Sequence, residues 1–161
     1  MILRIGAIAL IGLSTLASVG QQPSMDEPEK PKFYVTFVAE PVTVTAGHAT
    51  TLDLHFHIQP GYHINSHTPK SEFLIPTKLV FDSSHDVSLA PPTYPKGTEF
   101  SFSFDPKEKL DVYAGNFTVG TRITAKAGQH VVRGTLHYQA CNHAACFPPK
   151  SLPIEIIVNA K

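Results

Sequence analysis

The residues best suited to chemistry are two cysteines, Cys141 and Cys146, the only cysteines among the 161 residues. They stand five positions apart, where an apolar strand pattern gives way to Pro148 and Pro149. A turn of four intervening residues can bring two Cα atoms to the roughly 4.4–6.8 Å that is usual for a disulfide. The spacing therefore permits an intrachain disulfide.

Two roles are open for such a bond. As a staple, a closed loop of six residues stabilises the fold by only about 2 kcal/mol, against nearly 5 for a loop of one hundred residues. As a redox group, the pair benefits from the short spacing, because the second thiol can resolve a mixed disulfide without a large movement. The spacing favours the redox role, and a local structural clip is the alternative.

The N-terminal residues are typical of a targeting segment. A basic start at Met1–Arg4 precedes an apolar run from Ile5 to Leu16, which is too short to cross a bilayer as a helix. Small residues at 18–20 suit a signal peptidase, so we expect a signal peptide at 1–20, with an uncleaved anchor as the alternative. Disulfides persist outside the cytosol, so export favours a disulfide over a zinc site.

The rest of the chain divides simply. Residues 21–32 are polar, with three acidic residues and three prolines, which predicts a disordered linker. Residues 33–161 suit one domain with one core. Thirteen basic and thirteen acidic side chains cancel, so no basic face indicates a nucleic-acid partner. No later apolar stretch is long enough to cross a membrane.

The pattern of the domain is β throughout. Leu52, Leu54, Phe56 and Ile58 alternate with polar residues, which predicts a strand with one buried and one exposed face. Prolines and glycines punctuate the chain, and no long run has a helical period. We therefore predict an all-β, immunoglobulin-like antiparallel β-sandwich, with strands over Phe33–Val38, Val42–Thr45, Thr50–Ile58, Tyr62–Asn65, Lys78–Phe81, Val87–Leu89, Val112–Tyr113, Phe117–Ala125, Val131–Gln139 and Leu152–Val158.

The segment Ala90–Asp111 differs from this pattern. It contains four prolines together with Phe100, Phe102 and Phe104. Structureless segments of that length are usually functional or disordered, so we expect a functional loop here. The alternating phenylalanines are also consistent with an edge strand, which is the alternative.

Several stretches together resemble the N-terminal periplasmic domain of the thiol:disulfide interchange protein DsbD, over roughly residues 33–158. They are Gly61–Asn65, the proline-rich segment, Val112–Gly115, and Tyr138–Cys141 with Cys146–Pro149. The resemblance implies an immunoglobulin-like fold and no cofactor. It also implies that the cysteines accept electrons from a membrane-embedded partner and pass them to periplasmic thioredoxin-like proteins.

The resemblance also assigns roles to the cysteines and to a cap. Cys141 and Cys146 would form the redox disulfide, with Cys146 forming mixed disulfides and Cys141 resolving them. A cap loop would shield this bond from within Thr98–Asp105. Phe100, which follows Glu99, is the closest match to the shielding ring, and Phe102 and Phe104 are the alternates.

Other residues would form the surroundings of the disulfide, namely Tyr62, His63, Asn65 and His143. His63 and Asn65 stand where known members have tyrosines, and the intercysteine segment is one residue shorter. Because the sequence ends at Lys161, we expect a separate membrane-embedded thiol reductase as donor. We expect a periplasmic monomer that acts as a thiol:disulfide oxidoreductase.

Nine histidines raise a second possibility, a metal site. His55 and His57 lie two apart on a predicted strand and so share a face, where imidazoles could hold zinc or copper. Their spacing identifies no third ligand, although His63, His67 and His137 are candidates. His143, between the cysteines, could instead lower the pKa of a neighbouring thiol.

Three functions therefore compete. The leading hypothesis is an exported thiol:disulfide interchange module. The first rival is a protein-binding sandwich with a purely structural disulfide, whose reduction potential would lie below about −300 mV. The second is a periplasmic metal-binding protein that uses its surface histidines, which metal analysis would test.

Overall fold

The computed structural model describes residues 33–103 and 105–161, so the expected signal peptide at 1–20, the linker at 21–32 and Phe104 lie outside the described residues. No helix long and apolar enough to cross a membrane occurs in the described part. The described chain forms strands and no helix. The strands are β1 (Val35–Phe37), β2 (Val42–Val44), β3 (Thr50–Ile58), β4 (His63–Asn65), β5 (Lys78–Phe81), β6 (Val87–Leu89), β7 (Thr98–Phe102), β8 (Asp105–Tyr113), β9 (Asn116–Ala125), β10 (Gly128–Tyr138), β11 (Ala140–Cys141) and β12 (Lys150–Ala160).

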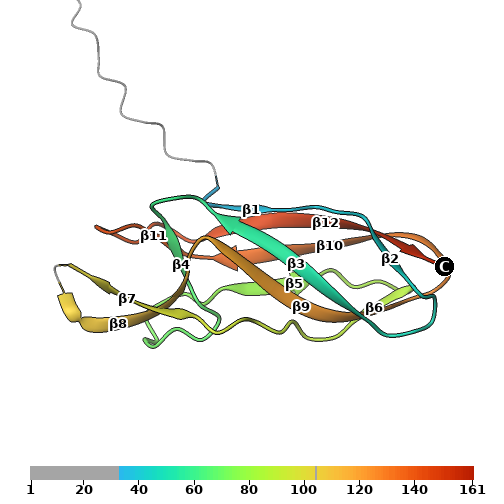
Figure 1. The fold of residues 1–161 in the computed structure, drawn as a ribbon, viewed down its shortest axis with the longest axis horizontal. Helices are drawn as coiled ribbons and strands as arrows, with labels where there is room; N and C mark the ends of the chain where they lie inside the picture. The colour runs from blue at the N-terminus through green and yellow to red at the C-terminus, as the bar shows by residue number, and fades with distance from the viewer. Residues whose placement is uncertain (1–32, 104) are drawn as a thin grey trace, which may run out of the picture. The chain divides into compact units, whose positions relative to one another are not determined.

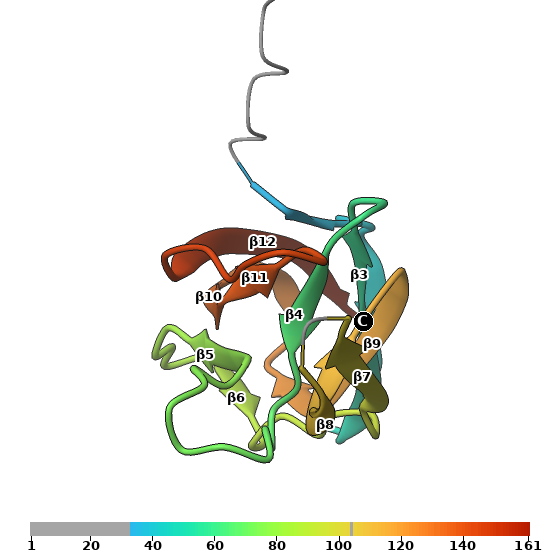
Figure 2. The same ribbon diagram turned by 90° about the vertical axis from the view of Figure 1, so that its left-hand side faces the viewer.

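These strands form three sheets of four (Figure 1). Two of them, β1-β3-β9-β6 and β2-β12-β10-β5, are the walls of a sandwich. The third, β11-β4-β8-β7, lies at the end that faces the viewer in Figure 2. Pairing is antiparallel except between β2 and β12, which run parallel. The predicted immunoglobulin-like sandwich is therefore confirmed.

The core follows from period-2 alternation in the long strands. In β3, Leu52, Leu54, Phe56 and Ile58 are buried while the residues between them are exposed. In β12 the side chains at 152, 154, 156 and 158 are buried in the same way. Each fully buried aliphatic or aromatic side chain contributes about 1.5–3 kcal/mol, so two facing rows of this kind hold the walls together.

The expected structureless loop over Ala90–Asp111 is wrong in its second half. Strands β7 and β8 pair there as an antiparallel hairpin, with β7 at the sheet edge. The physical reason is that Phe100 and Phe102 recur with the period of a strand and meet apolar partners. Phe102 packs with Leu110 and Val112 in a small cluster separate from the main core. The edge-strand alternative describes this segment correctly.

Residues 90–97, the first half of this segment, are also hydrogen-bonded to neighbouring strands. Thr93 and Gly120 exchange backbone hydrogen bonds of 2.7 and 2.9 Å, which attach the proline-rich stretch to β9. The Tyr94 hydroxyl accepts a 2.8 Å bond from the backbone N–H of Leu79 on β5. Residues 90–97 therefore bridge the two walls, and movement of the whole segment as one hinged loop is not expected.

Two further strands differ from the sequence-based expectation. β10 begins at Gly128 rather than Val131, because it pairs with β12 without interruption from Gly128–Ala160 to Tyr138–Lys150. β11 was not anticipated, since two residues carry no period. It forms because Ala140 and Cys141 pair with Ile64 and His63 of β4.

The small cluster beneath the hairpin can be tested by truncation. Phe102→Ala should lower the free energy of unfolding by about 3 kcal/mol, because the ring is buried against Leu110 and Val112. Phe73→Ala is the matched control, since that ring is 88% exposed and its loss should cost less than about 0.5 kcal/mol. Urea unfolding measures both, and equal small losses would show that the hairpin is not part of the cooperative fold.

Candidate functional site

The two cysteines form a disulfide across a short antiparallel turn. The backbone N–H of Phe147 donates to Ala140 O at 2.8 Å, and that of Asn142 donates to Ala145 O at 2.9 Å. These bonds flank Cys141 and Cys146, which are therefore a directly opposed pair without hydrogen bonds of its own, the closer of the two antiparallel pair types. Their Cα atoms lie 3.9 Å apart. Strand register thus brings the sulfurs together.

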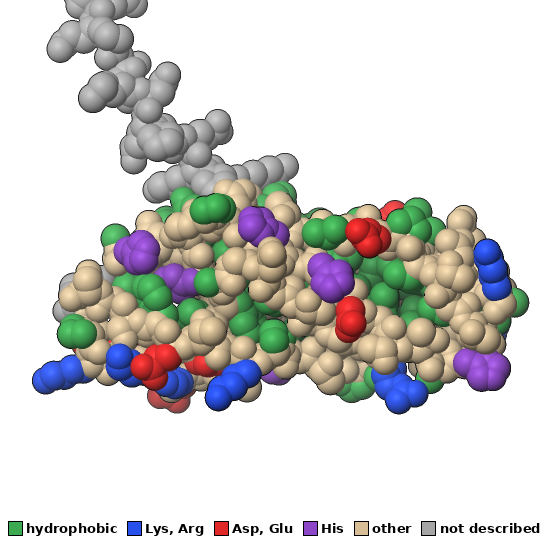
Figure 3. Space-filling model, in the orientation of Figure 1, with side chains coloured by type: hydrophobic (Ala, Val, Ile, Leu, Met, Phe, Trp, Pro, Cys, Tyr) green, Lys and Arg blue, Asp and Glu red, His purple; other side chains and the backbone are tan. Residues whose placement is uncertain are grey.

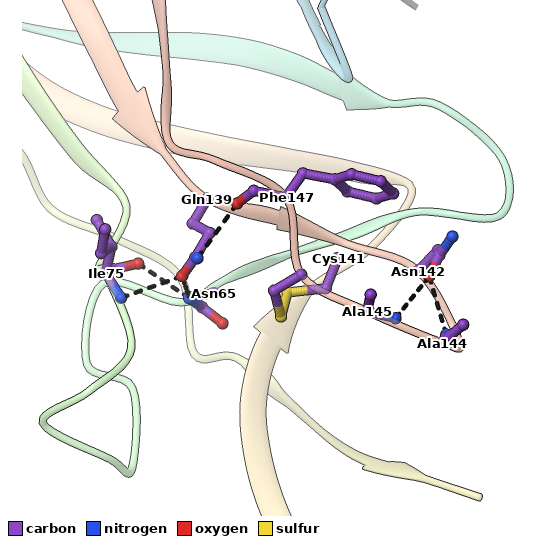
Figure 4. The surroundings of a disulfide bond; sticks show 9 residues. Asn65, Ile75, Gln139, Cys141, Asn142, Ala144, Ala145 and Phe147 are labelled. Carbon is purple, nitrogen blue, oxygen red and sulfur yellow. Dashed lines mark hydrogen bonds between the residues drawn. A yellow bond between two sulfur atoms is a disulfide. The ribbon is translucent and has the colours of Figure 1, made fainter. Parts of the chain in front are cut away.

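Asn142 shapes the turn between the cysteines (Figure 4). Its side-chain Oδ1 accepts hydrogen bonds from the backbone N–H groups of Ala144 at 2.8 Å and Ala145 at 2.9 Å. An asparagine that bonds the backbone two and three residues ahead makes a turn locally, without help from the rest of the fold. The shortened intercysteine segment is therefore a closed and ordered turn.

The two halves of the disulfide differ in exposure. Cys141, in β11, is fully buried, whereas Cys146, beyond the turn, is exposed. A thiolate from another molecule can therefore approach only the Cys146 side of the bond. This asymmetry is the feature of the site that bears most directly on chemistry.

A hydrogen-bond network of amide groups holds the base of the turn (Figure 4). Gln139 Nε2 donates to Phe147 O at 3.2 Å, and Gln139 Oε1 accepts from Asn65 Nδ2 at 3.1 Å and Ile75 N at 3.4 Å. Asn65 Nδ2 also donates to Ile75 O at 3.0 Å. The network joins the strand before Cys141, the residue after Cys146 and the loop that follows β4.

His63 is the direct cross-strand neighbour of Cys141. Its side chain is 4% exposed, and its ring lies 4.1 Å from the ring of Phe100, centroid to centroid. Its Nε2 is buried without a hydrogen-bond partner among the described residues. Burial, followed by the nearby His143, lowers the pKa of His63 from 6.5 to about 4. The imidazole beside the disulfide is therefore neutral at pH 7.

The predicted cap residues lie in different places. Phe100 is half-buried between His63 and His143, at 4.1 and 5.8 Å between ring centroids, so it lies beside the intercysteine turn. Phe102 meets it edge-on at 5.5 Å but is buried in the hairpin cluster. Phe104 lies outside the described residues. Of the predicted cap rings, Phe100 is therefore the one that lies beside the intercysteine turn.

Glu99 forms two ion pairs on the exposed surface of the β7–β8 hairpin. Its carboxylate meets Lys70 Nζ at 3.1 Å and Lys109 Nζ at 3.3 Å. Hydrogen bonds from these two lysines hold the pKa of Glu99 below its usual range. Figure 3 shows charged side chains along the edge of this end of the domain, below the histidine and hydrophobic side chains.

A second group of aromatic rings lies beside the turn, and Tyr34 is the member that sequence reasoning missed. Tyr34 stacks on Phe147 at 5.1 Å and lies 4.7 Å from Tyr62. Lys150 Nζ lies 5.1 Å from the Tyr34 ring centroid. Phe147 had a local signal, because it directly follows Cys146. Tyr34 had none, because it comes from the start of the domain.

The candidate histidine ligands have other partners. His55 Nδ1 and His57 Nδ1 hydrogen-bond to Thr118 Oγ1 at 3.0 Å and Asn116 Oδ1 at 2.7 Å. His67 instead stacks on Tyr94. Across residues 33–103 and 105–161, no group of three histidine, cysteine, aspartate or glutamate side chains could hold a metal.

The low pKa of His63 predicts a pH-dependent stability. The unfolded chain protonates this histidine near pH 6.5 and the folded chain near pH 4, so acidification across that window favours unfolding. Wild type should therefore lose up to about 3 kcal/mol relative to His63→Phe between pH 7 and pH 4, with no such divergence above pH 7. Urea unfolding across this range measures it, and parallel curves for the two proteins would contradict the assigned pKa.

Comparison with known proteins places the chain in a family. The family model described as "Thiol:disulfide interchange protein DsbD, N-terminal" matches residues 30–156. No curated protein sequence matches. Among solved structures, the reduced DsbD N-terminal domain of Neisseria meningitidis is 22% identical, with a TM-score of 0.43 over 67% of this chain and 77% of that one.

Two other solved structures are similar. The complex of the DsbD and PilB N-terminal domains from Neisseria meningitidis matches with 20% identity and a TM-score of 0.43, over 65% of this chain and 73% of that one. The N-terminal periplasmic domain of ScsB from Proteus mirabilis matches with 14% identity and a TM-score of 0.45, over 74% of this chain and 44% of that one. The family match spans most of the chain, which therefore belongs to the family of the N-terminal domain of the thiol:disulfide interchange protein DsbD.

Proposed function

We propose that the protein is a thiol:disulfide interchange module that passes two electrons through the Cys141–Cys146 bond. Family membership supports this function. The observation that carries it is the unequal exposure of the two cysteines, with Cys146 exposed and Cys141 fully buried. A bond made only for stability has no need of one accessible sulfur beside a half-buried ring.

The exchange runs by two thiolate attacks. A partner thiolate attacks Cys146 Sγ, the Cys141–Cys146 bond breaks, and its electron pair leaves on Cys141 Sγ. The second thiol of the partner then attacks the mixed disulfide and releases Cys146 as a thiolate. The partner leaves as a disulfide, and the module has gained two electrons and takes up two protons. The same steps in reverse reduce a partner disulfide.

The frame around the turn suits this chemistry. Gln139 and Asn65 tie both ends of the cysteine turn to the β4–β5 loop, and Asn142 closes the turn itself. Pro148 and Pro149 lack backbone N–H groups and restrict the chain directly after the exposed sulfur. A partner therefore meets a rim of fixed shape, which reduces the entropy lost on docking.

The physiological setting follows as part of the proposal. Residues 1–20 act as a signal peptide, residues 21–32 as a linker, and residues 33–161 as a periplasmic monomeric domain. A membrane-embedded thiol reductase supplies the electrons, and thioredoxin-like proteins accept them. The rival with a purely structural disulfide is tested below by reduction of the native protein.

The first test separates the roles of the cysteines. Cys141→Ser, first converted at Cys146 to its mixed disulfide with thionitrobenzoate, should exchange this group for a thioredoxin-like protein that keeps only its attacking cysteine, with release of thionitrobenzoate, because the exposed Cys146 meets the partner and nothing resolves the adduct. Non-reducing electrophoresis detects it. Cys146→Ser is the matched control and should trap little, because Cys141 is buried; trapping by Cys146→Ser alone would reverse the roles. The double serine variant should stay folded, about 2 kcal/mol less stable.

The second test concerns the cap. Phe100→Ala should speed reduction of the native disulfide by dithiothreitol several-fold, because access is one of the factors that set the exchange rate. Phe73→Ala removes an exposed ring from a different loop and should leave the rate unchanged. Thiol release and near-ultraviolet circular dichroism are followed together. If wild type released thiols only on unfolding, the structural-disulfide rival would be correct.

A further inference from the structure

One buried ionisable group at the site has no part in the exchange as described so far. His63 sits on β4 directly opposite Cys141, and both side chains are buried. Directly opposed residues on antiparallel strands have Cβ atoms about 4.5–5.5 Å apart and project from the same face of the sheet. The imidazole is therefore within reach of the Cys141 sulfur.

The imidazole also has an unused hydrogen-bonding nitrogen. Nε2 is buried without a partner among the described residues. A buried polar atom left unpaired costs about 1–3 kcal/mol, so a fold that needed only packing here would gain from an apolar side chain. Buried polar atoms without a partner are rare in native structures, so the unpaired Nε2 of His63 needs an explanation, and a chemical role supplies one.

A hollow of about 240 Å³ adjoins the imidazole, between the turn that precedes β4, the β7–β8 hairpin and the intercysteine turn. Ionisable side chains reach it or its rim from each of these elements: Tyr62, His143, Glu99 with its ion-pair partners Lys70 and Lys109, and Asp111, which pairs with Glu99 across the hairpin. Of these, His143 is the group whose charge acts on His63. The carboxylate of Glu99 is already engaged by two lysines.

We infer that His63 is the acid–base partner of Cys141, accepting the thiol proton when Cys141 resolves a mixed disulfide on Cys146 and returning it in the reverse direction. This role rests on the proposed function. In the resolving step the S–H bond of Cys141 breaks, and its proton moves to Nε2 of His63. The electron pair left on sulfur forms the Cys141–Cys146 bond. The bond from Cys146 to the partner sulfur breaks, and the partner leaves as a thiolate.

Phe100 links the proposed acid–base role of His63 to the shielding of the disulfide. With its ring 4.1 Å from the imidazole, burial is the largest cause that keeps the pKa of His63 near 4, where it is a weak base. Displacement of the ring by a partner removes part of that burial. The pKa then returns toward 6.5, where an imidazole is an effective base at neutral pH. The histidine becomes competent when the disulfide becomes accessible.

The test follows the two cysteines separately. The reduced protein is mixed with 5,5′-dithiobis(2-nitrobenzoate) in a stopped-flow instrument. Attack by Cys146 releases the first thionitrobenzoate, and closure by Cys141 releases the second. Reduction in denaturant followed by refolding supplies the dithiol form even if the native disulfide resists reduction, so the measurement does not depend on exchange with a protein partner.

His63→Phe should slow the second phase at least tenfold at pH 7 and leave the first unchanged, because only Cys141 loses its base. Its pH profile should move to that of an unassisted thiol, near 8.5. In His63→Ala, added imidazole should restore the second phase by entering the space left by the ring, and it should not do so in His63→Phe. His57→Gln, on the exposed face of β3, is the matched control and should alter neither phase.

Three results would overturn the assignment. They are an unchanged second phase in His63→Phe, an equal slowing of both phases, or a slowed second phase that keeps the wild-type pH profile. Unfolding by urea shows whether each variant is folded, and His63→Phe should be no less stable than wild type because it removes the unpaired nitrogen. Failure of the proposed function would appear elsewhere, as a native disulfide that resists dithiothreitol and a Cys141→Ser variant that captures no partner.

Discussion

The site depends on the strand register that gives Cys141 two opposed neighbours at once. On one side β11 pairs with β4, which places His63 opposite Cys141. On the other side the turn brings back Cys146 as an antiparallel partner. Cys141 is therefore enclosed by backbone on both sides, while Cys146 stands at the outer edge. If the segment 140–147 were paired one residue out of register, its side chains would turn to the opposite face of the sheet and the two sulfurs would be separated.

Polar contacts hold the segment around the two cysteines in addition to its contacts with the main core through Ala140 and Phe147. The core fills the space between the two walls, and the turn beyond β11 is anchored by Gln139, Asn65 and Asn142. Side-chain amides of this kind fix geometry because their hydrogen bonds have directions, which apolar contacts lack. Asn65 Oδ1 and His63 Nε2 nevertheless lack partners among the described residues, so the strands nearest the disulfide hold the unpaired polar atoms.

The β7–β8 hairpin forms a second, smaller packing unit. Its cluster of Phe102, Leu110 and Val112 is separate from the core of the sandwich, and β7 is an edge strand. Elements with few buried contacts open at lower free energy than the core does. Phe100 is carried by this element, whereas its contact partner His63 belongs to β4, which pairs with both β11 and β8. Phe100 therefore belongs to a smaller packing unit than the strands that carry the disulfide.

The sequence alone determined the elements whose signal is local. Period-2 alternation placed β3, β9 and β12, because one face of each strand is buried and the other is exposed. The spacing of Cys141 and Cys146 was enough to anticipate a short disulfide loop. Phe100 and Phe102 carried a strand period as well, but the four prolines around them led to the expectation of a loop, and their partners Leu110 and Val112 lie across a hairpin.

Tertiary structure decided everything that depends on distant segments meeting. Nothing near Cys141 in the sequence indicates that it would be buried and Cys146 exposed, since this follows from the pairing of β11 with β4. The same pairing makes His63 the cross-strand neighbour of Cys141, whereas the pairing of β3 with β9 gives His55 and His57 hydrogen-bond partners on β9. The low pKa of His63 is likewise a tertiary property, because burial and the approach of His143 cause it.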